Sequence, residues 1–501
     1  MSKFQPITFF DRRQDAAVVG EVAVATQQGA AVNGYQLMPF KFTELDADRF
    51  VMTNIAGEYL VMPKQQVRQF ADRTLPINSD AYVDLRSHHF LVDANTSVAP
   101  DLLAVKLRTR YSRLANFTGL HIFVVTLRCE HSCPYCQVSR QNEDSGSFDM
   151  TQEQASAAID LALRSPADAI KIEFQGGEPL LNFPLVQYIV NESKRRNNAH
   201  KELGFVIATN LAIISDEVLA FCKEHDVHIS TSLDGPRELH NRNRPRPGRD
   251  SYERVIEGIQ RSRDAIGKAN VSALMTTTEA SLSQVQAIID EYLAHDFKGI
   301  FLRPLSPYGF AIKTKSYRAY GVQRWLEFYK QGLDYVIELN RKGIEFREFY
   351  AATILKKMLT FDDPGYVDLM SPAGIALGAI VYNYDGAVFA SDEARMLAEM
   401  GDDKFRLGNV LSNTYEEIFL NETLLEALED SFAQSAPMCA DCAFEPYCGS
   451  DPVQHWGLHK DFLGRKTESE FCTRNMTIFK HLISLMESDP FIKSLFTRWA
   501  Q

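Results

Sequence analysis

Eight cysteines give this chain of 501 residues its clearest chemistry, because seven of them fall into two clusters. The first cluster reads Cys129-Glu-His-Ser-Cys133-Pro-Tyr-Cys136. Clustered cysteines in a chain whose thiols stay reduced suggest metal or redox chemistry rather than disulfides. A structural zinc ion takes four closed ligands, whereas only three thiolates lie close together here. Three thiolates suit a 4Fe–4S cluster that leaves one iron open for a small molecule, so the spacing favours iron–sulfur over zinc.

The second cluster lies near the end of the chain and consists of Cys439, Cys442, Cys448 and Cys472. Four ligands in two groups are typical of structural zinc, and four thiolates also complete the ligation of one closed iron–sulfur cluster. The residues alone leave both alternatives open. The eighth cysteine, Cys222, lies in an apolar helical pattern and is predicted to pack in the core.

The first cluster resembles the signature of the radical S-adenosylmethionine (SAM) superfamily. The spacing is Cys-x3-Cys-x2-Cys, with an aromatic residue, Tyr135, before the last cysteine, and it follows a predicted buried strand at 121–127. In that family the motif lies in the loop after the first strand of a partial (β/α)6 barrel. The resemblance implies that Cys129, Cys133 and Cys136 hold a 4Fe–4S cluster whose open iron binds SAM, with Tyr135 beside the cofactor.

Gly176-Gly177-Glu178-Pro179 resembles the SAM-binding motif of the same family and follows the next predicted strand. Two glycines allow a backbone to approach a ligand closely. Exposed backbone groups and the Glu178 carboxylate could then hold the ammonium group of the methionine. Taken alone, this tetrapeptide is an ordinary turn; its position one βα unit after the cysteines favours the cofactor.

Four further side chains are candidates for binding the cofactor or the substrate: Asn210, Ser232, Asp234 and Arg244. The first three match places where the family contacts the ribose, the methionine carboxylate or the substrate, although each could instead cap a turn. Arg244 lies in a basic stretch at 240–249 and is expected to bind a carboxylate. The alternative for that stretch is a solvated loop.

The segments that must position these residues alternate between strand and helix patterns. Six strands are predicted, at 121–127, 170–174, 205–208, 227–230, 271–275 and 299–302. Polar residues gather after the strands, where barrel active sites are built. The predicted fold class is α/β, a partial (β/α)6 radical SAM barrel with an N-terminal α+β, winged-helix-like domain and a C-terminal SPASM-like iron–sulfur domain.

Four parts are predicted: a peptide-recognition-like domain at 1–115, the barrel at 116–310, a helical bridge at 311–365 and an auxiliary-cluster domain at 366–490. The first part has three short strand patterns, followed by helical patterns at 64–73 and 100–108. This order resembles the leader-binding module of ribosomal peptide maturases, which captures a peptide by adding a strand to a sheet edge. The alternative is an accessory domain without that role.

The C-terminal cysteines resemble part of the SPASM extension of radical SAM enzymes, which in full holds two auxiliary clusters. This chain keeps four of its cysteines, but Ser371, Ser391 and Pro452 stand where three others are expected. The resemblance implies that the first auxiliary cluster is missing and that two 4Fe–4S clusters remain in the whole chain. Asp392 stands where an aspartate of sulfatase maturases acts as acid/base group; the alternative is a loop cap.

The run 384–395 and the block around Cys439 look most like the maturases of the His-Xaa-Ser peptide system. The resemblance implies a radical SAM oxidoreductase or maturase that cleaves SAM reductively and uses the 5′-deoxyadenosyl radical to modify a ribosomally synthesised precursor peptide. An external electron donor such as flavodoxin or ferredoxin is implied as a partner. Two alternatives remain, a sulfatase-type formylglycine maturase and a non-catalytic iron–sulfur or zinc scaffold that binds peptide.

Composition narrows the classes of partner. The net charge of −12 and the pI of about 5.6 argue against broad binding to nucleic acid or to a membrane surface. No apolar run approaches the ~18 residues of a membrane span. The charged residues at 11–13 argue against a secretory signal, so a cytoplasmic location is expected.

Overall fold

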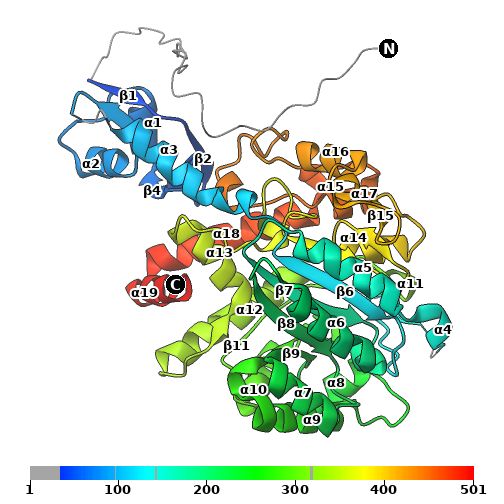
Figure 1. The fold of residues 1–501 in the computed structure, drawn as a ribbon. Helices are drawn as coiled ribbons and strands as arrows, with labels where there is room; N and C mark the ends of the chain where they lie inside the picture. The colour runs from blue at the N-terminus through cyan, green and yellow to red at the C-terminus, as the bar shows by residue number, and fades with distance from the viewer. Residues whose placement is uncertain (1–33, 96–97, 142–143, 316–319) are drawn as a thin grey trace, which may run out of the picture.

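The computed structural model describes residues 34–95, 98–141, 144–315 and 320–501, so the first 33 residues of the predicted N-terminal domain lie outside the described part. Figure 1 shows a small N-terminal module at one corner of a larger body. That body contains the barrel strands and helices, together with the C-terminal helices that lie above them in this view.

The N-terminal module combines two small antiparallel sheets with three helices. Its elements are β1 (Tyr35–Leu37), β2 (Phe40–Glu44), β3 (Arg49–Asn54), β4 (Tyr59–Pro63), α1 (Lys64–Ala71), α2 (Asp80–Ser87), β5 (Leu91–Asp93) and α3 (Ala99–Arg110). Strands β2, β3 and β4 pair in that order, and β1 pairs with β5. The helices predicted at 64–73 and 100–108 are confirmed as α1 and α3. The module has its own hydrophobic core around Phe70, Leu85 and Phe90.

The barrel alternates strands and helices as predicted. Its elements are β6 (Leu120–Thr126), α4 (Ser145–Phe148), α5 (Gln152–Leu163), β7 (Ala169–Gly176), α6 (Phe183–Arg196), β8 (Glu202–Thr209), α7 (Asp216–His225), β9 (Val227–Ser232), α8 (Arg237–Asn243), α9 (Ser251–Ile266), β10 (Val271–Leu274), α10 (Val285–Ala294) and β11 (Gly299–Ile300). Strands β6 to β10 are parallel and adjacent in chain order. Six of the seven residues of β6 are buried, as expected for a parallel strand covered on both faces.

The sixth predicted strand, at 299–302, does not join the main sheet. Strand β11 is only two residues long and pairs with β12 (Arg347–Glu348) outside the main sheet. Two residues beyond its end, the Leu302 N–H donates to the Glu348 carboxylate instead of to a neighbouring strand. Instead, β13 (Ala379–Tyr382) pairs in parallel with β6, and β14 (Ala387–Phe389) and β15 (Arg406–Asn409) extend the sheet to eight strands. The predicted C-terminal domain therefore shares one sheet with the barrel.

The rest of the chain is largely helical. Its helices are α11 (Phe310–Lys313), α12 (Val322–Arg341), α13 (Phe349–Leu359), α14 (Asp392–Ala398), α15 (Tyr415–Phe419), α16 (Glu422–Asp430), α17 (Pro452–His459), α18 (Glu470–Ser488) and α19 (Pro490–Trp499). The apolar face of α12 is buried around Trp325, Tyr329 and Leu333, which confirms that the predicted bridge contributes core residues. Within the described residues, no helix is long and apolar enough to cross a membrane.

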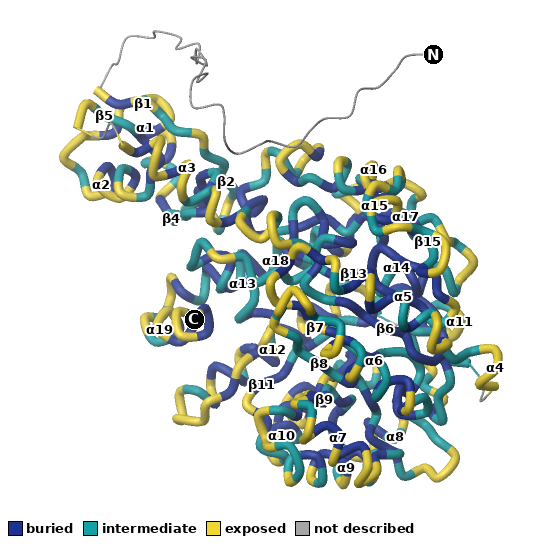
Figure 2. The backbone as a smooth tube through the Cα atoms, in the orientation of Figure 1, coloured by how far each residue is buried: buried dark blue, intermediate teal, exposed yellow. Residues whose placement is uncertain are grey.

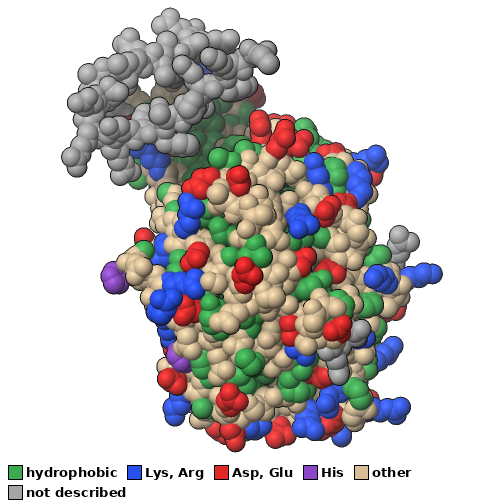
Figure 3. Space-filling model, turned by 45° about the vertical axis from the view of Figure 1, so that its right-hand side comes forward, with side chains coloured by type: hydrophobic (Ala, Val, Ile, Leu, Met, Phe, Trp, Pro, Cys, Tyr) green, Lys and Arg blue, Asp and Glu red, His purple; other side chains and the backbone are tan. Residues whose placement is uncertain are grey.

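One hydrophobic core runs through the barrel, the bridge and the C-terminal helices. Figure 2 shows buried stretches in the region of β6 and α14. On the face seen in Figure 3, acidic and basic side chains are interspersed. This face therefore offers no broad basic surface, as the acidic composition predicts.

Candidate active site

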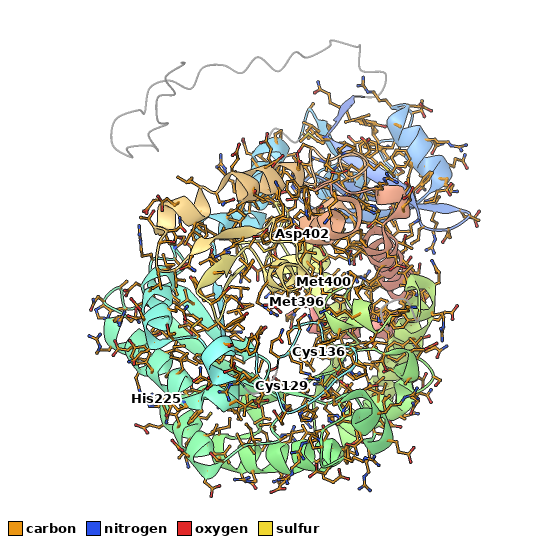
Figure 4. The ribbon with its side chains drawn as sticks, turned by 90° about the vertical axis from the view of Figure 1, so that its right-hand side faces the viewer. Cys129, Cys136, His225, Met396, Met400 and Asp402 are labelled. Carbon is orange, nitrogen blue, oxygen red and sulfur yellow. The ribbon has the colours of Figure 1, made fainter. Side chains whose placement is uncertain are left out.

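The first cysteine cluster lines a cavity of about 250 Å³ at the carboxyl ends of the barrel strands. Ten of the predicted site residues line it: Cys129, Cys133, Tyr135, Cys136, Gly176, Gly177, Asn210, Ser232, Arg244 and Asp392. In Figure 4, Cys129 and Cys136 lie below Met396 of α14, which also lines the cavity. Three predicted residues, Glu178, Pro179 and Asp234, are not part of the lining. The barrel and the C-terminal part thus both contribute to this cavity.

Backbone hydrogen bonds shape the cysteine loop. The Cys136 N–H donates to the Cys133 carbonyl over 3.1 Å, and the Ser132 N–H donates to the Pro245 carbonyl over 2.8 Å. Burial raises the pKa of the Cys133 thiol to about 12 and that of Cys129 well above its usual range. A coordinating metal reverses this cost, because a thiol bound to a cation is deprotonated outright. Three soft sulfur ligands around one cavity fit an iron–sulfur cluster.

Both glycines of the Gly-Gly-Glu-Pro motif are required by close contact with the protein itself. A Cβ on Gly176, which has a φ of +143°, would lie 1.8 Å from the Thr126 carbonyl oxygen. A Cβ on Gly177 would lie 2.1 Å from the Arg128 carbonyl oxygen. The glycines let the end of β7 pass against the start of the cysteine loop, and this close approach brings both residues to the cavity wall.

Glu178 connects two loops of the barrel. Its carboxylate accepts hydrogen bonds from Thr209 Oγ1 at 2.7 Å, from the Asn210 N–H at 2.8 Å and from the Leu180 N–H at 3.1 Å. The side chain is fully buried, and burial raises the pKa of its carboxyl group. The structure therefore shows Glu178 holding the end of β8 against the end of β7. Its contact with a methionine ammonium group stays a prediction.

Asp234 anchors two cavity residues from behind. It accepts a hydrogen bond from the Tyr135 hydroxyl at 2.6 Å, and Arg244 donates to both of its carboxylate oxygens, at 3.1 and 3.2 Å. Burial opposes ionisation of Asp234, but Arg244 outweighs it and lowers the pKa of the carboxyl group. The Arg244 guanidinium also lies 5.5 Å from the centre of the Tyr135 ring. A carboxylate partner for Arg244 thus exists within the chain, while the guanidinium still lines the cavity.

Asn210 and Asp392 combine a local structural contact with a place in the cavity lining. The Asn210 side chain accepts a hydrogen bond from the Ala212 N–H at 2.8 Å, so it does cap a turn. Asp392 begins α14 and accepts a hydrogen bond from Arg395 Nε at 3.2 Å. Because α14 belongs to the C-terminal part, Asp392 reaches the cavity from a different segment than the cysteines do.

Sequence reasoning missed several lining residues: Glu173, Gln175, Thr276, Arg303 and Met396. Glu173 and Gln175 alternate along β7, and Gln175 Nε2 donates to Glu173 Oε1 over 2.7 Å. Polar residues two apart in a strand point to the same face of the sheet. This alternation in the sequence could therefore have identified both residues as candidates for the cavity lining. Nothing in the local sequence marks Met396, because it reaches the cavity through tertiary packing.

The C-terminal cysteines surround a second cavity of about 200 Å³. All four line it, together with Phe42 and Thr43 of β2 from the N-terminal module. A tetrahedral zinc ion about 2.3 Å from each ligand would bring the sulfur atoms to roughly 3.8 Å from one another. Within the described residues, no three of these sulfur atoms lie within 4.8 Å of one another. Four thiolates around one cavity can complete the ligation of one iron–sulfur cluster or of one zinc ion.

Each of the three positions where a further cysteine was expected has an ordinary structural role. The Ser371 hydroxyl accepts the Ala433 N–H at 2.9 Å, and the Ser391 hydroxyl caps α14 by accepting the Ala394 N–H at 3.1 Å. Pro452 begins α17, where its missing N–H costs nothing. These residues offer no soft ligand, and the loss of one auxiliary cluster stays a prediction.

Residues 123–291 match the family described as the Radical SAM superfamily. The chain therefore contains a radical SAM domain. An uncharacterised protein of Methanocaldococcus jannaschii, MJ0907, is 31% identical over 189 residues, which span 37% of this chain and 62% of that protein. The cysteine-type anaerobic sulfatase-maturating enzyme of Clostridium perfringens is 23% identical over 336 residues, 64% of this chain and 84% of that enzyme.

Solved structures share the fold of this chain. The structure of native anSMEcpe with bound AdoMet and the Cp18Cys peptide has a TM-score of 0.62 and 20% identity, and the match covers 76% of this chain and 99% of that one. SuiB of Streptococcus suis bound to the precursor peptide SuiA has a TM-score of 0.52 and 13% identity, covering 87% and 99%. These matches confirm the predicted α/β fold class.

Proposed function

We propose that this protein is a radical SAM enzyme that cleaves SAM reductively and modifies a ribosomally synthesised peptide. The observation that carries the proposal is the single cavity shared by the three cysteines, the glycine turn and Asp392. When bound, the cluster and SAM would supply an electron and a carbon-centred radical able to take hydrogen from an unactivated C–H bond. A cytoplasmic location and a donor such as flavodoxin or ferredoxin are part of the proposal.

The chain's own residues would bind and orient the reactants. Cys129, Cys133 and Cys136 would hold the cluster, and the backbone at 176–177 with Asn210 and Ser232 would contact SAM. Arg244 is held in place by Asp234 and would orient a carboxylate. Asp392 would exchange a proton at its carboxylate with the substrate.

The C-terminal cysteines would hold a second 4Fe–4S cluster with four protein ligands. Full ligation leaves no open iron, so this site would transfer electrons or brace the structure rather than bind substrate. The four thiolates, the apolar lining, which includes Phe444 and Phe479, and the likeness of the cysteine spacing to the SPASM extension support this assignment.

Peptides bound in structurally similar proteins support a peptide substrate for this chain. Cp18Cys and SuiA are the peptides bound in two structures of the same fold. The N-terminal module offers a small antiparallel sheet, β2–β3–β4, to which a peptide strand could be added at an edge. A substrate from the His-Xaa-Ser system stays the narrower prediction.

A sulfatase-type maturase is the second candidate. The match to 84% of the Clostridium perfringens enzyme and the presence of Asp392 in the cavity favour it. The serines at 371 and 391 and the proline at 452 argue against it, because they remove the ligands of one cluster. A non-catalytic scaffold would not need the three-cysteine cavity to be joined to the glycine turn and Asp392.

The test is the anaerobic release of 5′-deoxyadenosine from SAM after reduction with dithionite. We expect wild-type protein to release it, and Cys129→Ala, Cys133→Ala and Cys136→Ala each to reduce the yield by at least about 100-fold, because two thiolates cannot hold the cluster. Cys222→Ala is the matched control and should retain the activity, since Cys222 is a buried residue of α7 outside both cysteine clusters. Near-wild-type release from a cluster variant would refute the proposal.

The mass change of the peptide separates the two candidates. A peptide carrying the target cysteine or serine of a sulfatase should stay unmodified, while a precursor peptide encoded beside this chain should change mass. Formation of formylglycine in the sulfatase peptide would support the second candidate, the sulfatase-type maturase.

A further inference from the structure

An asparagine contacts the C-terminal cysteine site from the interior of the protein. Helix α18 carries Cys472 and, one turn later, Asn475, so both side chains lie on the same face of the helix. Asn475 is fully buried, and its Nδ2 lies 3.8 Å from Cys448 Sγ, within hydrogen-bonding range for sulfur. Asn475 thus reaches a cysteine that lies on a different segment from its own helix.

A tyrosine determines which way the amide faces. The hydroxyl of Tyr350, in α13, donates a hydrogen bond to Asn475 Oδ1 at 2.6 Å. With its oxygen held by this donor, the amide presents its N–H groups to the Cys448 sulfur. The reversed orientation would place the amide oxygen against a thiolate, and two acceptors repel each other.

Tyr350 also connects Asn475 to a neighbouring cavity. Tyr350 lines a small polar cavity of about 40 Å³ that also contains Arg303, and Arg303 in turn lines the central cavity. Tyr350 also packs edge-on against Tyr366, with ring centres 5.9 Å apart. The Asn475 amide therefore contacts the C-terminal site on the side where Tyr350 and this small cavity lie.

We propose that Asn475 is a positioning residue that raises the reduction potential of the cluster held by the C-terminal cysteines, and that Tyr350 fixes its orientation. The proposal rests on the proposed function, because it needs an iron–sulfur cluster at this site. Reduction adds one negative charge to the cluster, and an N–H donor to a ligating sulfur stabilises the more negative state. Removing the donor should therefore make the cluster harder to reduce.

The experiment compares Asn475→Leu with wild type in the full chain after anaerobic reconstitution. Potentiometric titration followed by electron paramagnetic resonance gives the midpoint of each cluster. The C-terminal step is the one that persists when Cys129, Cys133 and Cys136 are all replaced by Ala. We expect Asn475→Leu to shift this step to a more negative potential and to leave the other step unchanged.

Thr477→Val is the matched control. It lies two residues further along α18, and its hydroxyl donates only to the Thr473 carbonyl, at 2.7 Å. Both midpoints should stay at their wild-type values in this variant. An equal shift in Thr477→Val would mean that the helix, rather than the amide, sets the potential, and would overturn the proposal.

Tyr350→Phe tests the orienting contact and should give a smaller shift in the same direction. The double variant Tyr350→Phe, Asn475→Leu removes both partners of the buried hydrogen bond, so it keeps the fold if the single variant does not. It should keep its iron and show the same negative shift. If both Asn475→Leu and the double variant lose the C-terminal iron, Asn475 is needed for assembly and the proposal is wrong.

Two failures can be told apart. Zinc in place of iron at this site would remove the C-terminal reduction step altogether, and would contradict the cluster assignment in the proposed function. A C-terminal step that is present but unshifted in Asn475→Leu would contradict this inference alone.

Discussion

At the scale of single residues, two buried carboxylates, those of Glu178 and Asp234, fix the residues around the cavity of the first cysteine cluster. Glu178 ties the ends of β7 and β8 together from inside the barrel. Asp234 holds Tyr135 and Arg244 from behind the cavity wall. These contacts fix the orientation of side chains at the cavity, as a functional site needs.

Glu178→Ala should destabilise the barrel as well as weaken SAM binding. The Thr209 hydroxyl and the Asn210 N–H lose their buried acceptor, so the free energy of unfolding should fall by about 3 kcal/mol. Glu202→Ala, an exposed glutamate at the start of β8, is the control and should cost less than about 0.5 kcal/mol. Thermal unfolding of the apoprotein measures both. Wild-type stability in Glu178→Ala would show that these hydrogen bonds contribute nothing.

Glu393, the residue after Asp392, should make the stability of the protein depend on pH. Burial, followed by the nearby Asp368, Asp392 and Asp451 carboxylates, raises the pKa of Glu393 from 4.5 to about 8. Between pH 4.5 and 8 the unfolded chain loses this proton while the folded chain keeps it, so the contribution to stability is lost as the pH rises.

Glu393→Gln removes that titration. Relative to wild type, the free energy of unfolding of the variant should rise by at least about 1 kcal/mol between pH 5 and pH 8. The value is set low because the Glu393 carboxyl group is partly exposed. Unfolding by urea at the two pH values gives the difference. The exposed Glu429→Gln is the control and should follow wild type at both. Parallel pH curves for Glu393→Gln and wild type would contradict the prediction.

At the scale of elements, the end of α3 joins the N-terminal module to the rest of the chain. Arg110 is buried there and donates to the carbonyls of Ala56, Pro446 and Lys357, at 2.9, 2.9 and 3.1 Å. Lys41 of β2 adds an ion pair with Glu445, with 2.9 Å between the charged atoms. The module has a core of its own, but Val51 of β3 belongs to the main core, so apolar packing and these polar contacts together hold the module in place.

Arg110→Met should loosen the module without unfolding it. Three buried carbonyls lose a charged donor, two of them (those of Pro446 and Lys357) across the interface, and the loss should cost about 3 kcal/mol. Limited proteolysis should then cleave the chain after α3 at least about tenfold faster. Arg108→Met, an exposed arginine in the same turn of α3, is the control and should leave the rate unchanged. Equal rates in both variants would show that Arg110 does not hold the module.

At the scale of the whole molecule, each part completes a site of another part. Asp392 and Met396 bring the C-terminal part to the central cavity. Phe42 and Thr43 bring the N-terminal module to the C-terminal cysteines. The predicted domains are therefore not independent units, and the strand pair β6–β13 joins two of them in one sheet.

The iron content should reflect two clusters. After anaerobic reconstitution we expect about eight irons in each chain, and about four when Cys129, Cys133 and Cys136 are all replaced by Ala. Iron and zinc are measured together by mass spectrometry of the metal. About twelve irons would mean that unrecognised ligands hold a third cluster, and four irons with one zinc would mean that the C-terminal site is structural.

Local patterns in the sequence were enough for most elements of the barrel. Strand runs and helix caps are short-range signals; Thr151, for example, caps α5 in a capping box with Gln154. The cysteine spacing indicated two thiol clusters, and the structure places each set around one cavity. The short β11 was overestimated, because Glu348, 46 residues away from Leu302, accepts the N–H that would have continued the strand.

What the sequence by itself determined is the chemistry available: three thiolates beside a glycine turn, and four thiolates at the end of the chain. Only the tertiary structure decided which side chains share a cavity. Asp392 and Met396 reach the cysteines, and Asn475 reaches Cys448, through contacts between segments far apart in the chain. Such contacts follow from how the apolar faces of helices and sheet pack together, and no local spacing records that packing.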